Sequence, residues 1–269
     1  MSKNIHLREA QVMTAIKWAA MILLIVDHAT IALFDNDPIG RAVGRLAFPL
    51  FAYMIAVGLQ YSSNPLKYFK RILLFAFISE IPFDLFVANI PFYFMSQNIL
   101  FTFAIAMGLY LLVARLNYQA YAWLAAFVAG YVLGELCCVD YGGIGVVTVL
   151  TFKLAIYGLK GDKLNARFGQ ALGCALISFG YVISYSIEIG APYFGMQILA
   201  AFALLILLFS KGVPADFSKA SKKYSRLFYL VYPLQFVILW AISIALGWQT
   251  LPNVIAVIPD LLTGNLIYF

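Results

Sequence analysis

The chain has 269 residues, of which 64% are hydrophobic and only 11% are charged, and its mean hydropathy is +0.90. A soluble domain is nearer half apolar with about a quarter of its residues charged, so this composition excludes an ordinary soluble protein and indicates an integral membrane protein. The net charge of +6 is expected to set the orientation in the membrane, and no nucleic-acid partner is inferred from it.

Long apolar runs recur along the chain after a polar start. Residues 1–12 are mixed in charge and no small-residue cleavage site follows them, so they predict a cytoplasmic tail and not a signal peptide. Runs of about 20 apolar residues, each long enough to span a bilayer, cover 13–34, 42–62, 68–88, 98–116, 120–138, 142–160, 168–187, 193–210 and 226–247. The tail at 248–269 is too short to span and is expected to lie along the interface. The predicted fold is an all-α, polytopic membrane protein with about nine transmembrane helices, forming a single domain over residues 1–269.

The basic residues support this number of helices, because they fall mainly on one side of the membrane when the helices alternate in direction. That side receives Lys3, Arg8, Lys67, Lys70, Arg71, Arg115, Lys160, Lys163, Arg167, Lys211, Lys219, Lys222, Lys223 and Arg226. The other side receives mainly acidic residues, with Arg41 and Arg45 as the exceptions. The pattern predicts a cytoplasmic N-terminus and a C-terminus on the outside.

The cysteines give no sign of a metal or disulfide site. Cys137, Cys138 and Cys174 form neither a disulfide framework nor a metal-ligand spacing. We interpret Cys137 and Cys138 as small apolar residues near a membrane surface, and we expect no metal.

A few ionisable residues remain at membrane depth after the loops are assigned. Each of them costs at least about 2–3 kcal/mol on insertion scales, so each is a candidate for a functional role. They are Asp27, His28, Arg41, Arg45, Glu80, Asp84 and Lys153.

His28 is the first candidate, because histidine is the side chain whose ordinary pKa suits a general base near neutral pH. The alternative is a neutral imidazole that joins neighbouring helices. Lys17 precedes His28 by eleven residues, which places both on nearly the same helix face, about 16 Å apart along the axis. This spacing suits an elongated substrate such as an acyl-CoA, with its phosphates near Lys17 and its thioester deep in the membrane. Lys17 can equally be an interfacial lysine that extends towards water.

Asp27 points about 100° away from His28, so it is expected to pair with a basic residue of another helix, Arg41 or Arg45. These two arginines share one helix face. They either clamp an anionic group of the substrate at the outer mouth or compensate the neighbouring acids. Gly40 and Gly44 have the spacing that favours close helix packing.

Glu80 precedes Pro82, which is expected to kink its helix and to let backbone groups line a cavity. The carboxyl group can support the base or face the acceptor. A buried, protonated glutamate that joins helices is the alternative.

Several blocks along the chain carry a family resemblance: IKWAAMILLIVDHA, GRLAFPLFAYMIAVGL, NILFTFAIA, DYGGIGVV and FYLVYPLQFVIL. In this order they resemble the TraX family of inner-membrane proteins, which are associated with acetylation of the pilin amino terminus in conjugative pili. The similarity runs from about Ile16 to Leu246, and the Asp-His pair followed by the Gly-Arg-x-Ala-Phe-Pro-Leu-Phe-Ala block is its most specific part.

The first two blocks also resemble a wider class of transmembrane acyltransferases, in which a basic residue precedes a histidine by ten intervening residues. Lys17 and His28 match this pattern, and Phe48 to Phe51 match a Phe-Pro-x-Phe stretch. The resemblance implies that the histidine acts in acyl transfer from a cytoplasmic acyl-CoA to an acceptor on the far side. Several relatives have a histidine in the last helix, where this chain has Gln235, which cannot act as a base.

The sequence therefore predicts an acetyltransferase of the bacterial cytoplasmic (inner) membrane that uses acetyl-CoA as its acyl donor. Its partners would be the lipid bilayer and a pilin or another membrane-presented acceptor. The predicted catalytic residues are His28, Asp27, Arg45 and Glu80, the predicted donor-binding residues are Lys17, Lys67, Lys70 and Arg71, and the predicted acceptor-binding residues are Arg41, Asp140, Tyr141, Tyr232 and Gln235. The alternatives are a proton-coupled transporter or flippase, a non-catalytic pilus-assembly factor, and an acyltransferase that acts on a glycan or lipid hydroxyl.

Overall fold

The computed structural model describes residues 2–34, 37–158 and 217–249, and every regular element within these ranges is an α-helix. The helices are α1 (Ser2–Leu33), α2 (Pro38–Gly44), α3 (Ala47–Tyr61), α4 (Pro65–Ala88), α5 (Ile99–Arg115), α6 (Ala120–Leu136), α7 (Gly142–Gly158) and α11 (Phe217–Ala245). The all-α prediction is confirmed in this part of the chain. The helices expected at 168–187 and 193–210, and the tail from residue 250, lie outside the described residues.

The helices differ in how well their length and composition suit a membrane span. Within the described residues, three stretches are long and apolar enough to cross a membrane: Thr14–Leu33, Ile39–Tyr61 and Leu227–Ala245. Shorter apolar helices cover Ile99–Arg115, Ala120–Leu136 and Gly142–Leu154. The number of nine membrane-spanning helices remains a prediction, and so does the side of the membrane on which each terminus lies.

Two helix boundaries differ clearly from the prediction. The first helix begins at Ser2 and not at residue 13, because the polar segment before it is rich in good helix formers. The single helix expected at 42–62 is two helices, α2 and α3, which meet at Arg45 and Leu46. Pro49, near the start of α3, has no N–H to donate to the carbonyl of Arg45, and this favours the break.

The start of α2 is set by Asp37 and Pro38. The Asp37 side chain accepts hydrogen bonds of 3.0 Å from the backbone N–H groups of Ile39 and Gly40, and Pro38 occupies the first turn. α2 then lies against α1, where a Cβ atom on Gly40 would overlap Thr30 and one on Gly44 would overlap Asp27. The close packing predicted from the two glycines is confirmed.

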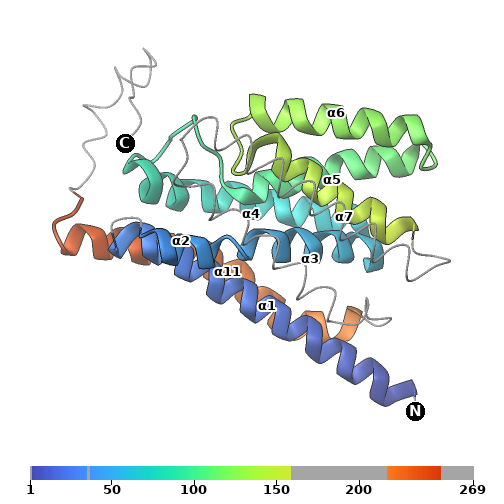
Figure 1. Cartoon of the computed structure of the whole chain (residues 1–269), viewed down its shortest axis with the longest axis horizontal. Helices are drawn as coiled ribbons and strands as arrows, with labels where there is room; N and C mark the ends of the chain where they lie inside the picture. Colours follow the sequence, from blue (N-terminus) through green and yellow to red (C-terminus); the bar gives the residue numbers. More distant parts are fainter. Residues whose placement is uncertain (1, 35–36, 159–216, 250–269) are drawn as a thin grey trace.

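Six of the described helices pack on one another in a closed ring, and Figure 1 shows α1 and α11 along one edge of the molecule and α6 along the opposite edge. α1 packs on α11, α11 on α4, α4 on α5, α5 on α7, α7 on α3, and α3 returns to α1. α6 packs on the outside of this ring, against α5 and α7, and α2 packs on α1. The ring matters for function because its inner faces enclose the cavity described below.

Candidate functional site

An ion pair between α1 and α2 starts the site. Nη1 of Arg41 lies 2.8 Å from Oδ2 of Asp27, so the pairing of Asp27 with an arginine of the next helix, predicted from the sequence, is confirmed. The absence of a side chain at Gly44 lets α2 approach Asp27 closely enough for this pair to form. Oδ1 of Asp27 is buried and accepts no hydrogen bond from the described residues.

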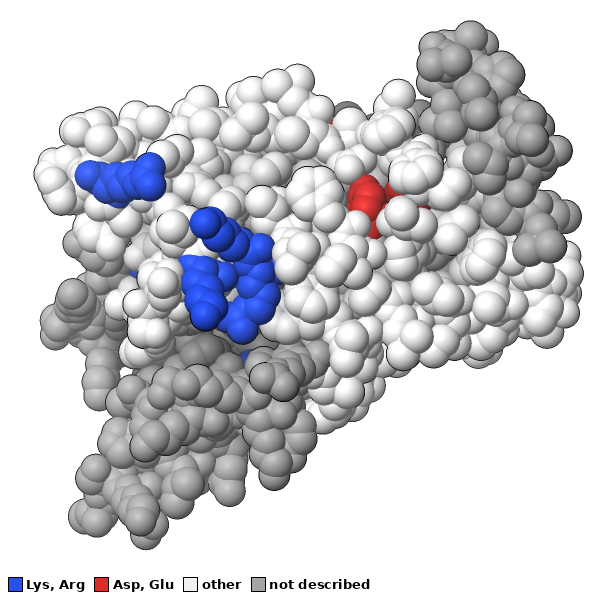
Figure 2. Space-filling view, turned by 180° about the vertical axis from the view of Figure 1, so that it is seen from behind, with Lys and Arg blue, Asp and Glu red and all other residues white. Residues whose placement is uncertain are grey.

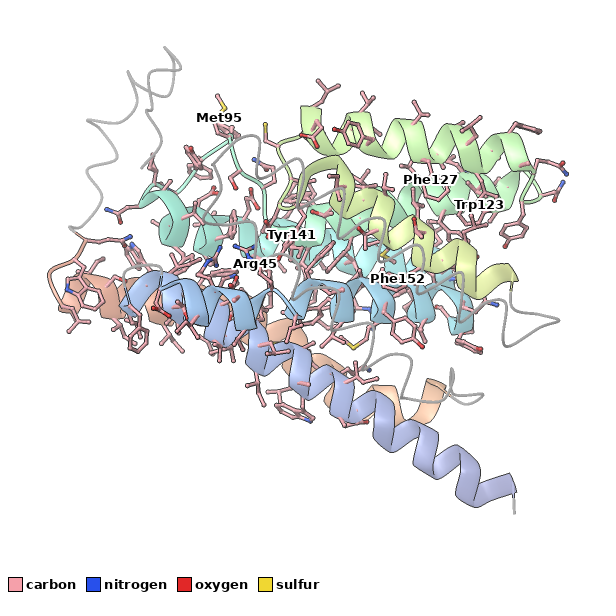
Figure 3. All side chains as sticks on the ribbon, viewed as in Figure 1. Arg45, Met95, Trp123, Phe127, Tyr141 and Phe152 are labelled. Atoms are coloured by element: carbon pink, nitrogen blue, oxygen red, sulfur yellow. The ribbon has the colours of Figure 1, made fainter. Side chains whose placement is uncertain are left out.

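Arg45, at the end of α2, is joined to the connection between α6 and α7 (Figure 3). Its Nη1 donates a 3.2 Å hydrogen bond to the Tyr141 hydroxyl, and its guanidinium carbon lies 5.9 Å from the centre of the Tyr141 ring. The Tyr141 ring stacks on Phe48 of α3 with a centroid distance of 4.0 Å. Arg45 is thereby held in a buried position, although it is 96 residues from Tyr141 in the sequence.

Asp140 is fixed in place by the connection between α4 and α5. Its backbone N–H donates to the carbonyl of Gln97 over 2.8 Å, and its carbonyl accepts from the Thr102 hydroxyl over 2.6 Å. Burial raises the pKa of the Asp140 carboxyl to about 6, against the effect of Arg45, which favours the charged form. Asp27 and Arg41 also act electrostatically on this carboxyl, so the sequence-distant acids and arginines form one cluster.

His28 lies beside this cluster in an aromatic environment. Its ring centroid is 4.7 Å from that of Phe236 in α11 and 5.5 Å from that of Phe86 in α4. The side chain is buried, and Nδ1 has no hydrogen-bond partner in the part of the chain that the structure describes. Gln235 lies close enough to the imidazole to act on it as a side-chain hydrogen-bond partner, although neither polar atom of Gln235 makes a hydrogen bond of regular geometry among the described residues. His28 therefore keeps a nitrogen that can accept a proton or a hydrogen bond from a substrate.

The acids of α4, Glu80 and Asp84, are hydrogen-bonded to the connection that follows this helix. Oε2 of Glu80 accepts hydrogen bonds from the Asn98 side chain and from the Asn98 backbone N–H, the second over 3.2 Å. Oδ2 of Asp84 accepts from the backbone N–H of Tyr93 over 2.9 Å. These bonds fix the connection between α4 and α5. Within the described residues, no hydrogen bond of Glu80 reaches His28.

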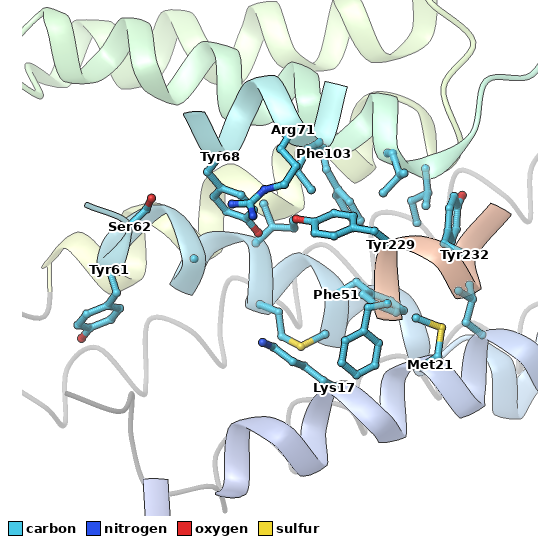
Figure 4. A pocket seen from close by; sticks show the side chains of 18 of the residues that line it. Lys17, Met21, Phe51, Tyr61, Ser62, Tyr68, Arg71, Phe103, Tyr229 and Tyr232 are labelled. Atoms are coloured by element: carbon cyan, nitrogen blue, oxygen red, sulfur yellow. The ribbon is translucent and has the colours of Figure 1, made fainter. Parts of the chain in front are cut away.

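A cavity of about 360 Å³ occupies the inside of the helical ring (Figure 4). Its outer end is formed by exposed or half-buried residues, among them Lys17 of α1, Ser62 and Ser63 after α3, and Arg71 of α4. Its inner end is formed by the buried residues Ile99, Phe103 and Tyr232, and apolar side chains line the length between. The cavity therefore has a basic, open end and an apolar, closed end.

The predicted donor-binding residues divide in two. Lys17 and Arg71 line the cavity. Arg71 is positioned at the open end by two tyrosines, with its guanidinium carbon 5.7 Å from the ring centre of Tyr68 and 5.6 Å from that of Tyr229. Lys67 and Lys70 are exposed on the same helix and lie outside the lining. Figure 2 shows that lysines and arginines gather towards one end of the molecular face that it displays, away from the acidic side chains.

The helix α1 links the cavity to His28. Lys17, Met21 and Leu24 line the cavity, and His28 follows Leu24 by four residues on the same stripe of the helix. Tyr232, at the closed end, lies within electrostatic range of Asp140 and Glu80. The cavity thus leads towards the polar cluster that contains His28.

A protein-family model matches most of the chain. The model of the family described as TraX protein matches residues 12–243, which include every helix named above from residue 12 of α1 onwards and most of α11. The chain belongs to the TraX family. No curated protein and no solved structure matches it.

Family membership and the apolar helices together make the chain a membrane protein with a conjugation-associated, pilin-related function. The TraX resemblance predicted from the sequence blocks is confirmed. No group of three or more histidine, cysteine or acidic side chains that could hold a metal ion occurs among the described residues.

Several residues of the site were not predicted from the sequence. Phe86 and Phe236 surround His28, Thr102 donates a hydrogen bond to the carbonyl of Asp140, and Asn98 donates hydrogen bonds to Glu80 of α4. A phenylalanine in an apolar helix gives no signal of its own. The position of Phe236 within the TraX-like block FYLVYPLQFVIL was the one available indication.

Proposed function

We propose that this TraX-family protein is a membrane acyltransferase that moves an acetyl group from acetyl-CoA to an amine, the amino terminus of a pilin subunit. The observation that carries the proposal is the cavity with a basic open end whose α1 stripe continues to His28. We place the protein in the bacterial inner membrane with the open end of the cavity on the cytoplasmic side, where acetyl-CoA is available.

The donor fits the cavity by charge and polarity. The phosphates of acetyl-CoA would lie at Lys17 and Arg71, with the exposed Lys67 and Lys70 adding to the positive potential outside. The pantetheine arm would extend between the apolar side chains, which include Met21 and Phe51. The thioester would then lie at the closed end, near Leu24 and Tyr232.

His28 would act as the general base. The amine nitrogen attacks the thioester carbonyl carbon, the carbon–sulfur bond breaks, and CoA leaves as a thiolate. The proton that the nitrogen loses passes to His28 and then to the thiolate, so acetyl-CoA and the amine become the acetamide and CoA thiol. Arg45 would stabilise the negative charge that develops on the carbonyl oxygen, as preorganised cationic donors do.

The polar residues around His28 would receive the acceptor. Asp140 and Tyr141 belong to the polar cluster, Gln235 lies beside His28, and Arg41 is held in the cluster by Asp27. The buried polar atoms of His28 and Gln235 that lack partners within the described chain are the groups that an incoming amine and its backbone can satisfy.

A proton-coupled transporter is the second candidate, and one observation favours it. Buried carboxylate oxygens of Asp27, Glu80 and Asp84 and the Nδ1 atom of His28 have no hydrogen-bond partner among the described residues, as in membrane proton pathways. A transporter requires a gradient, whereas acyl transfer proceeds in detergent without one.

The test is CoA-thiol release from acetyl-CoA by the purified protein in detergent, with a peptide that carries a mature pilin-like amino terminus. The same peptide with a blocked amino terminus is the substrate control. His28→Ala is expected to abolish peptide-dependent release while eluting as a monodisperse protein. His6→Ala, which removes the other of the chain's 2 histidines, is the matched control and should release CoA at the wild-type rate.

The outcomes separate the candidates. Equal release by wild type and His28→Ala would remove His28 from the mechanism. Equal release with free and blocked peptides would exclude the amine acceptor and favour a hydroxyl. Release by neither protein, together with uptake that depends on a proton gradient, would favour the transporter.

A further inference from the structure

On both α1 and α11, the last residue that lines the cavity is one helical turn away from a residue of the His28 site: His28 itself on α1 and Phe236 on α11. On α1 the last lining residue is Leu24, and His28 is the next residue on the stripe. On α11 the last lining residue is Tyr232, and Phe236 is the next. One turn of helix is about 5.4 Å. The closed end of the cavity is therefore separated from His28 by about one turn, and Phe236 lies at that level.

The Phe236 side chain fills this interval. It is fully buried, its ring centroid lies 4.7 Å from that of His28, and it meets the Tyr232 ring edge to face at 5.2 Å. Phe83 and Phe86 of α4 pack on its other sides, with centroid distances of 5.4 and 5.3 Å. Phe236 thus contacts both the last residue of the cavity and the proposed base, and three rings hold it in place.

An interval of one turn suits a base that acts on the acceptor and not on the thioester. The base must come within about 3 Å of the amine nitrogen, and that nitrogen must come within about 3–3.5 Å of the thioester carbonyl carbon. The carbonyl carbon is then about 6 Å from the base, which places it at the closed end of the cavity. The part of the acyl chain beyond the carbonyl must fit between Leu24, Tyr232 and Phe236.

We propose that Phe236 determines the acyl-chain specificity of the site, by closing the deep end of the donor cavity so that only a short acyl group fits. The inference rests on the proposed acyl transfer and goes beyond it, since it assigns a size limit to the donor and a residue that sets it. A protein interior is packed too densely to take further methylene groups at this position without displacing the Phe236 ring.

The experiment compares acetyl-CoA, butyryl-CoA and hexanoyl-CoA as donors for the same acceptor peptide. The wild type is expected to prefer acetyl-CoA to hexanoyl-CoA by at least about tenfold in kcat/KM, in the range that a few methylene groups produce in an apolar pocket. Phe236→Leu, which shortens the side chain towards Tyr232 and His28, should raise the ratio of hexanoyl to acetyl turnover by about tenfold or more.

Phe152→Leu is the matched control. Phe152 of α7 is as deeply buried as Phe236 and contacts the Tyr53 ring at 5.8 Å, but it does not line the cavity and lies away from the cluster of Arg45 and Tyr141 (Figure 3). Its substitution removes the same atoms from the core and should leave the donor ratio of the wild type. A second variant, Phe236→Met, also removes the ring but leaves a flexible, unbranched apolar side chain, and it serves if the leucine variant does not fold.

Donor binding is measured as well, as the rise in melting temperature that each acyl-CoA produces without the acceptor. Hexanoyl-CoA should raise the melting temperature of Phe236→Leu more than that of the wild type. If the variants turn over acetyl-CoA and their donor ratio stays within twofold of the wild type, the role of Phe236 is refuted and the acyltransferase stands. If no acyl-CoA is bound or turned over by any of the proteins, both the inference and the proposed function are refuted.

Discussion

Two regions of the helical ring bury ionisable side chains, and they differ in how completely these side chains are satisfied. Between α3, α5 and α7, the fully buried Lys153 donates a 2.5 Å hydrogen bond to Oε1 of Gln60 and lies 4.4 Å from the centre of the Tyr110 ring. Between α1 and α11, His28 and Gln235 are also buried, yet they keep polar atoms that make no hydrogen bond of regular geometry among the described residues.

The difference separates a structural role from a functional one. A buried polar group that is hydrogen-bonded stabilises the packing of the helices around it, and native interiors satisfy nearly all such groups. Polar atoms that stay unsatisfied destabilise the fold unless a ligand or another group satisfies them in use. Lys153 was selected from the sequence on the same grounds as His28, so membrane depth alone does not distinguish the two roles. Their partners do.

Substitutions in or beside the two regions should therefore change different properties, and the largest effect is expected for Arg45, whose charge acts on His28. Arg45→Met should lower kcat for peptide acetylation by about 10²–10³-fold, the usual consequence of losing one donor to a developing oxyanion. The measurement is CoA-thiol release with saturating peptide. Arg115→Met, which removes an exposed arginine at the end of α5, should leave the rate unchanged. A loss below threefold at Arg45 would remove it from the mechanism.

Lys153→Met should instead lower the stability. The substitution removes the donor to Oε1 of the partly buried Gln60, so the free energy of unfolding is expected to fall by about 1–3 kcal/mol. The measurement is the melting temperature of the purified protein, with kcat determined on the folded fraction. If Lys153→Met keeps its melting temperature and loses turnover, the distinction between the two regions is wrong.

Gly44→Ala tests the packing that brings Asp27 and Arg41 together. The added Cβ would overlap Asp27, and we expect a loss of stability of about 1–3 kcal/mol from this overpacking, together with a displaced ion pair. The control is Gly108→Ala, whose Cβ would meet the Phe69 ring at an ordinary contact distance of 3.7 Å. Both variants are compared by thermal unfolding. Equal melting temperatures for the two would show that α2 can move away from α1 at no cost.

The pH dependence of stability reports on Asp140, and we expect the smallest effect there. Its pKa of about 6 in the fold lies above the value of about 3.9 for an unfolded aspartate. The folded chain therefore binds more protons between about pH 4 and 6, and stability should decrease as the pH rises through this window. Asp140→Asn should flatten that part of the curve of melting temperature against pH. An unchanged slope would mean that Asp140 is not buried as described.

The sequence predicted much of the local structure and several of the contacts. Apolar runs predicted the helices, because any backbone in a bilayer must satisfy its own hydrogen bonds. The pairing of Asp27 with Arg41 followed from the direction of adjacent side chains and from the absence of water to solvate a lone carboxylate. The contact of Gly40 and Gly44 with α1 followed from their spacing on one face.

Contacts between helices far apart in the chain could not be predicted in this way. From the sequence, Glu80 could support the base, face the acceptor or join helices, and only the tertiary structure shows that its hydrogen bonds are with Asn98, which caps α5. Lys67 and Lys70 were grouped with Arg71 because they are neighbours in sequence, although Arg71 alone of the three lines the cavity.

By itself the sequence determined that this protein is a helical membrane protein of the TraX family, with a histidine and a lysine on one stripe of its first helix. Those properties depend on composition, on short blocks of sequence and on the period of a single helix. The tertiary structure decided that α1, α3, α4, α5 and α11 enclose a cavity, that Tyr141 meets Arg45, and that Phe236 lies between the cavity and His28. These contacts depend on how the side chains of separate helices pack together, and no period within one helix specifies that.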